Sequence, residues 1–190
     1  MPVDPMSGET IIRHCSPTLA GLKTGSLFGS VFESREAMYR EIRGLNRILG
    51  GKGLRVMPLQ WNAETHRALI YMYRPSRLEA DFQDHTCGDL LRDAGYTGKS
   101  CNRCIARLIR RLQECEEFPH EIGLFLGYPP EDVSGFIRYG SRACKCVGYW
   151  KVYGDEQKAL RIFARYKKCT DLYLRQLRCG KSIEQLAVAG

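Results

Sequence analysis

The segment around Cys15 could supply a reactive thiolate. Arg13, His14 and Cys15 come directly before Pro17, a residue typical of the first turn of a helix. The positive end of a helix dipole and a neighbouring imidazole both lower the pKa of a thiol, which makes the nucleophilic thiolate available. The alternative is that Ser16 simply caps this helix. The sequence therefore predicts Cys15 as a candidate catalytic residue.

A second candidate is the pair His120 and Glu121, which follows Pro119 in the first turn of a predicted helix. An imidazole and a carboxylate can act together as general acid and base, and groups at a helix start face solvent or a ligand. The alternative is that Glu121 complements the helix dipole and His120 is an ordinary surface residue. The turn at 127–130 reverses the chain, so the starts of two short helices could border one cleft.

Two close cysteine pairs offer thiolates for zinc or an iron–sulfur cluster: Cys101 with Cys104, and Cys144 with Cys146. On a helix, however, the first pair would share the apolar side of the core stripe, and the second pair lacks the spacing of zinc ribbons. The sequence therefore favours buried core cysteines and no metal site, with the four-cysteine site as the alternative.

The chain has nine cysteines in 190 residues, which is too few for a scaffold built from disulfides. The first ten residues contain no export signal, and no stretch is long and apolar enough for a membrane span. We therefore expect reduced thiols, a cytoplasmic location and no membrane association. Sensing of iron or redox state through these thiols is an alternative function.

The net charge of +8 raises the question of a polyanionic partner. Arginines at 103, 107, 110 and 111 fall on one arc of a predicted helix, and phosphate contacts supply most of the non-specific affinity for nucleic acid. Against this, three glutamates follow within 114–117, and no nucleic-acid motif accompanies the arginines. Nucleic acid is therefore an unfavoured partner, and binding through this arginine face is a further alternative function.

The elements that must position these residues indicate an α+β fold that is rich in helix. A hairpin at about 54–74 and a strand at about 144–153 should form a small antiparallel sheet, covered by several helices. Residues 1–10 should form a disordered tail and residues 11–190 a single globular domain. Outside the sheet just described, the pattern predicts a strand at 26–32, helical pieces within 75–96, short helices at 17–23 and after Pro119, Pro130 and Ser182, and long helices at 34–49, 100–114 and 155–179.

The strings FPHEIGLFLGYPPEDV (118–133) and WKVY (150–153) are specific enough to suggest a relationship. With CSPTLAGLK (15–23), they resemble a domain-of-unknown-function family of anaerobic Firmicutes, over about 13–188. The resemblance implies an anaerobic cytoplasm but no established activity, and it is loosely associated with flavodoxin and ferrous-iron neighbours. A flavodoxin or an iron-related protein is therefore an expected partner. The resemblance directs attention to Cys15, Lys23, His120, Glu121, Tyr128, Trp150 and Lys151.

Together these patterns predict a protein that binds a small anionic ligand or cofactor in a cleft, with a role in redox or iron physiology suggested by the resemblance. Cys15, His120 and Glu121 would be catalytic residues of one shared site. The sequence identifies neither the cofactor nor a reaction, because no complete catalytic constellation occurs at fixed spacing. The expected ligand contacts are Lys23, Arg74, Tyr128, Trp150 and Lys151.

Overall fold

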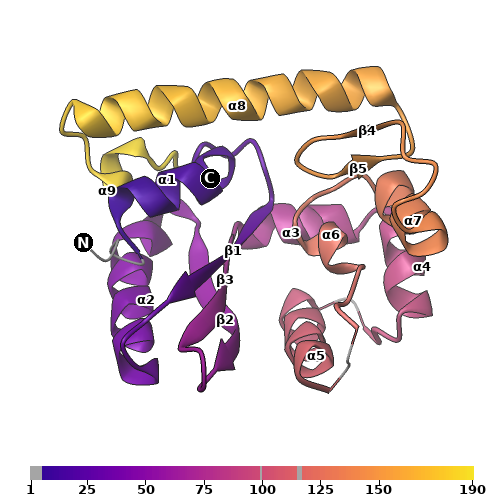
Figure 1. The fold of residues 1–190 in the computed structure, drawn as a ribbon, viewed down its shortest axis with the longest axis horizontal. Helices are drawn as coiled ribbons and strands as arrows, with labels where there is room; N and C mark the ends of the chain where they lie inside the picture. The colour runs from indigo at the N-terminus through magenta and orange to yellow at the C-terminus, as the bar shows by residue number, and fades with distance from the viewer. Residues whose placement is uncertain (1–5, 99, 115–116) are drawn as a thin grey trace. The chain divides into compact units, whose positions relative to one another are not determined.

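The computed structural model of the protein describes residues 6–98, 100–114 and 117–190. These residues form two compact units, which are described separately (Figure 1). Unit 1 combines the described residues of 1–76 with residues 168–190. Unit 2 comprises the described residues of 77–167. Two compact units can belong to one domain, so the single domain expected from chain length stays a prediction. The expected α+β class is confirmed.

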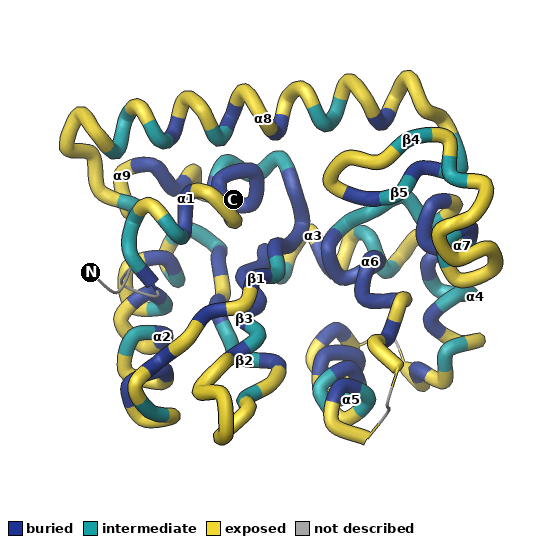
Figure 2. The backbone as a smooth tube through the Cα atoms, in the orientation of Figure 1, coloured by how far each residue is buried: buried dark blue, intermediate teal, exposed yellow. Residues whose placement is uncertain are grey.

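Unit 1 contains a three-stranded antiparallel sheet with the order β1-β3-β2. Its strands are β1 (Gly25–Val31), β2 (Arg55–Asn62) and β3 (Arg67–Tyr73). The register between β2 and β3 shifts between Pro58 and Gln60. Proline cannot donate a ladder hydrogen bond, and it accordingly lies beside a bulge on an edge strand. The central strand β3 is the most buried of the three (Figure 2).

Helices α1 (Gly8–Leu19) and α2 (Arg35–Leu49) pack against β1 and β2, respectively. The Ser34 hydroxyl accepts a hydrogen bond from the backbone N–H of Ala37, as expected for the N-cap of α2. The prediction of a helix start at Pro17 is wrong, because α1 begins at Gly8 and buries Ile11 and Cys15 within its length. Residues 8–10 of the expected tail thus belong to a helix, whereas 1–5 lie outside the described residues.

Unit 1 is completed by the turn η1 (Gly50–Lys52), by the end of α8 (Glu156–Arg178) and by α9 (Ile183–Leu186). The short helix predicted after Ser182 is α9, and Ser182 and Gln185 form a capping box at its start. No helix in the described ranges has the length and apolar character needed to cross a membrane.

Unit 2 consists mainly of helices. Its elements are most of α3 (Pro75–Phe82), then α4 (His85–Asp93), α5 (Cys101–Glu114), α6 (Ile122–Phe125), α7 (Pro130–Tyr139), β4 (Cys146–Val147), β5 (Lys151–Val152) and the first part of α8. The segment 144–153 does not join the larger sheet, whose third strand is β1; it forms a separate two-stranded sheet. The segment instead folds back and pairs with itself as β4 and β5, and Gly148 permits this reversal close to α8, because a Cβ atom there would lie only 2.3 Å from the Phe163 ring.

Candidate functional site

An aromatic pocket lies in unit 2, beside α6, α7 and β5. Its volume is about 360 Å³. It is lined by five rings (Phe118, His120, Tyr128, Phe136 and Trp150), by Ile122, Gly123 and Val133, and by the side chains of Asp132 and Lys151. We call this cavity the aromatic pocket. It brings together four of the predicted site residues, namely His120, Tyr128, Trp150 and Lys151.

The rings of the pocket pack against one another and are therefore held in place. Tyr128 and Trp150 lie with their centroids 4.9 Å apart, and the edge of His120 meets Phe136 at 4.8 Å. The ammonium of Lys151 lies 5.0 Å from the centroid of the Phe136 ring. The pocket is thus preformed, with one cationic side chain among its aromatic walls.

Tyr128 acts in this pocket as a hydrogen-bond donor. Its hydroxyl donates to the backbone carbonyl of Tyr149 at 3.1 Å. Burial raises the pKa of Tyr128 to about 12, with a smaller contribution from Tyr166. The phenol therefore stays protonated at neutral pH and cannot serve as a base there.

Asp132 is the residue of the pocket that sequence reasoning missed. Its Oδ2 accepts a hydrogen bond from Trp150 Nε1 at 2.7 Å, and its Oδ1 accepts from the backbone N–H groups of Tyr153 and Gly154 at 2.7 and 2.8 Å. These bonds tie α7 to β5 and fix the Trp150 ring. An acid two residues after Pro130 looks like an ordinary first-turn residue, and its partners lie about 20 positions away, so no local pattern signals the role.

Gly123 allows the helices beneath the pocket to approach closely. A Cβ atom there would lie 2.8 Å from Val133 Cγ2 and 3.1 Å from Tyr128 Cδ2. A larger residue would therefore push α6 away from α7 or displace the Tyr128 ring.

Glu121, expected to act beside His120, does not line the aromatic pocket. Its side chain is buried, and its Oε1 lies 2.7 Å from Arg111 Nε. The same oxygen accepts a hydrogen bond from the Tyr96 hydroxyl at 2.8 Å. A carboxylate held by a guanidinium and a phenol is a structural group, so the geometry gives no support to an acid–base role for Glu121.

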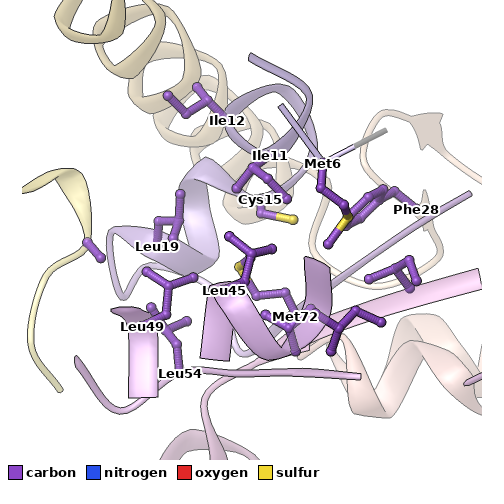
Figure 3. Close-up of a cluster of buried hydrophobic side chains, with 14 of the residues drawn as sticks. Met6, Ile11, Ile12, Cys15, Leu19, Phe28, Leu45, Leu49, Leu54 and Met72 are labelled. Carbon is purple, nitrogen blue, oxygen red and sulfur yellow. The ribbon is translucent and has the colours of Figure 1, made fainter. Parts of the chain in front are cut away.

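Cys15 lies in the hydrophobic core of unit 1, among Ile11, Leu45 and Met72 (Figure 3). Burial raises the pKa of its thiol to about 12, although Lys23 and Ser26 act in the opposite direction. The expected lowering of this pKa by a helix start does not occur, because Cys15 is in the interior of α1. At neutral pH the group is a neutral thiol.

Lys23 is also buried in unit 1. Burial lowers the pKa of its amine to about 8, while the neighbouring Cys15 raises it. Lys23 therefore lies in the interior beside Cys15 and does not line the aromatic pocket.

Arg74, another expected ligand contact, is 2% exposed and makes structural hydrogen bonds. Its guanidinium donates to the carbonyls of Thr18, Leu19, Lys52 and Val188, at distances of 2.8, 2.8, 3.2 and 2.7 Å. These bonds connect the end of α1 with η1 and with the segment after α9. Cys15, Lys23 and Arg74 thus belong to unit 1 and the other predicted site residues to unit 2, so neither unit by itself contains the predicted shared site.

The cysteine pairs do not provide metal-site geometry. Across the described ranges, no group of three or more His, Cys, Asp and Glu side chains is placed to hold a metal ion. Cys101 and Cys104 are buried on α5, and burial raises the pKa of both thiols, that of Cys101 to about 11. This environment agrees with core positions for Cys101 and Cys104, whereas Cys144 and Cys146 are partly exposed, and the four-cysteine site stays an alternative prediction.

Comparison with known proteins gives one match. The model of a family described as "Protein of unknown function (DUF3793)" matches residues 11–187. No curated protein and no solved structure matches the chain. The family match agrees with the resemblance to a domain of unknown function, while an origin in anaerobic Firmicutes stays an expectation.

Proposed function

Because the chain belongs to the family described as "Protein of unknown function (DUF3793)", we propose a function from its own site: the aromatic pocket binds a small planar molecule that carries an anionic group. The observation that carries this proposal is the set of five rings around a cavity of about 360 Å³, with the Lys151 ammonium among them. This volume falls in the range of small-molecule sites, roughly 300–1,000 Å³.

The walls of the pocket favour a flat, apolar ligand body. Rings of this kind gain energy from offset stacking and edge contacts with another π-system. The Tyr128 hydroxyl and the Trp150 indole N–H already donate hydrogen bonds to Tyr149 and Asp132, so they do not require a hydrogen-bond acceptor on the ligand. Most of the binding energy should therefore come from apolar burial and stacking.

The charges of the pocket favour an anionic substituent. An ammonium has three donors, and the one described hydrogen bond of Lys151 goes to Ser141 Oγ at 2.6 Å. The negative charge of Asp132 is compensated by three donors. Lys151 and the imidazole of His120 are then the groups available to contact an anion.

We assign binding rather than a reaction to this site. Glu121, the expected partner of His120 in acid–base chemistry, is paired with Arg111 instead. We favour ligand binding over thiol-based sensing, because burial raises the pKa of Cys15, Cys87, Cys101, Cys104 and Cys169 and leaves these thiols mainly in the unreactive protonated form.

The test uses Trp150 as a reporter. Trp61 lies on β2 in unit 1, so the variant Trp61→Phe leaves Trp150 as the single tryptophan. We would titrate this variant with anilinonaphthalene sulfonate, an anionic aromatic probe, and with the neutral probe N-phenyl-1-naphthylamine. Both should quench Trp150 emission saturably, with one site per chain.

Substitution of Lys151 distinguishes the contribution of its charge to ligand affinity from that of the aromatic rings. In the Trp61→Phe background, Lys151→Ala should weaken the anionic probe about fivefold or more, equivalent to ~1 kcal/mol, and leave the neutral probe within twofold. Lys158→Ala removes an equal charge from an exposed position of α8 and should change neither affinity. Absence of saturable quenching, or equal effects of the two lysine variants, would refute the proposal.

A further inference from the structure

A second pocket of unit 2, which we call the arginine pocket, lies between α5 and the segment before it. Its volume is about 470 Å³. Arg103, Arg107 and Arg110 line one side at positions i, i+4 and i+7 of α5, and Gly95 to Thr97 line the other. With a rise of about 1.5 Å per residue, the first and last of these arginines begin roughly 10 Å apart along the helix.

The positive charge of this pocket is poorly compensated. None of the described residues that line it is acidic. Within the residues that the structure describes, Arg103 and Arg110 form no ion pair, and Arg107 only approaches Glu114, at 4.0 Å. The Nε atom of Arg107 is buried and has no hydrogen-bond partner in the same part of the chain. A buried donor without a partner is costly, so an acceptor supplied by a ligand would stabilise it.

Arg111, the next arginine of α5, shows the contrast. Its guanidinium forms an ion pair with the buried Glu121, which also accepts from Tyr96, although the Arg111 Nε, like that of Arg107, is outside hydrogen-bond geometry in the described residues. Arg111 is thus neutralised internally, whereas the three pocket arginines have no equivalent carboxylate among the described residues.

From this arrangement we propose that the arginine pocket binds the phosphate groups of a small organic phosphate carrying at least two negative charges. A guanidinium binds phosphate oxygens through two parallel N–H donors, which fixes orientation as well as charge. Thr97 lines the same cavity, and a threonine hydroxyl can supply a further donor. This site is separate from the aromatic pocket and does not depend on its proposed function.

The observations favour a small ligand over a nucleic acid. The charges line one hollow of about 470 Å³ rather than an extended groove, and Glu114 and Glu117 follow at the end of the helix. Single-stranded nucleic acid also needs exposed rings on which bases stack. The one ring of the pocket, that of Tyr96, is buried.

The test is calorimetric titration of the full chain with pyrophosphate in dilute salt. We expect saturable binding that the double variant Arg103→Gln/Arg110→Gln weakens at least tenfold. Both arginines are exposed, so the double variant should remain folded, which circular dichroism would verify. Arg161→Gln, which removes one positive charge from an exposed position of α8, should leave the affinity within twofold.

Further measurements distinguish phosphate binding in the arginine pocket from ligand binding in the aromatic pocket and from nucleic-acid binding. Anilinonaphthalene sulfonate should bind the double arginine variant as it binds the unchanged protein, because that probe reports on the aromatic pocket. Absence of pyrophosphate binding, or an equal response of the double variant and Arg161→Gln, would overturn the proposal. Tighter, arginine-dependent binding of a twelve-residue oligothymidylate than of pyrophosphate would also overturn it, in favour of nucleic acid.

Discussion

At Asp132, one buried carboxylate accepts hydrogen bonds from an indole and from two backbone N–H groups. Asp132→Ala leaves all three donors without this acceptor. Hydrogen bonds to a charged group contribute about 1.5–3 kcal/mol each, and partial access of water to the freed donors offsets part of the loss. We therefore expect the free energy of unfolding of unit 2 to fall by about 3 kcal/mol, measured by urea denaturation.

The control is Asp93→Ala, because Asp93 is exposed and lies at the end of α4. This change should stay within about 0.5 kcal/mol of the unchanged protein. In the Trp61→Phe background, Asp132→Ala should also shift Trp150 emission to the red as the indole gains access to water. Similar stabilities of the two aspartate variants would show that Asp132 does not hold the pocket together.

The residues of the aromatic pocket show what sequence can and cannot indicate about a site. His120, Tyr128, Trp150 and Lys151 were identifiable because they lie in two distinctive motifs. The environment of Cys15 was misjudged, because a local pattern of His, Cys, Ser and Pro does not reveal that the helix begins seven residues earlier. Charge state depends on burial, and burial depends on packing between distant segments.

Among the elements, α7 depends on a glycine that helix propensity disfavours. A Cβ atom at Gly135 would lie 2.4 Å from Cγ of Tyr153, so the helix could not keep its contact with the segment after β5. Gly135→Ala gains up to about 1 kcal/mol of helix propensity but must displace a packed ring, at a cost of roughly 1–3 kcal/mol. We expect a net loss of stability, seen as a lower urea midpoint.

Gly88→Ala is the matched change on α4, where a Cβ atom would meet no atom within 4 Å. Only the gain in helix propensity affects stability there, because the added Cβ atom displaces nothing. This variant should therefore be more stable than the unchanged protein by about 0.5–1 kcal/mol. Opposite signs for the two variants are the expected result. Stabilisation by both would show that Tyr153 moves aside at little cost.

Elements with complete local signals were predictable from the sequence. Helix α2 carries its Ser34 cap, its apolar repeat and its terminal glycines, and the hairpin predicted at about 54–74 contains β2 and β3. The pairing of segment 144–153 was not predictable, because the choice between two sheets depends on contacts with Asp132 and Phe163. Propensity identifies a strand but not its neighbour.

On the scale of the whole molecule, buried thiols occur in both units and make stability depend on pH. Burial raises the pKa of Cys15 and Cys87 from 9.0 to about 12, and that of Cys101 and Cys169 to about 11. Between pH 9 and these values, the unfolded chain loses protons that the folded chain retains. The stability contributed by each thiol is fully present below pH 9 and is lost as the pH rises toward the folded pKa.

Lys23 changes the stability with pH in the opposite direction, but it is a single group, whereas four thiols lower the stability at high pH. Its pKa falls from 10.5 to about 8 on folding, so between these values the unfolded chain binds the extra proton and stability rises with pH. The net expectation is a lower urea midpoint at pH 10.5 than at pH 8, measured with a phosphine reductant present. Cys15→Ala removes one of the four thiols and should reduce this pH dependence, whereas Cys179→Ala, at an exposed position, should leave it unchanged. A midpoint that is constant or rises over this interval, or equal pH dependence in the two variants, would show that the thiols are not buried in the folded protein, because burial is the largest cause of their raised pKa values.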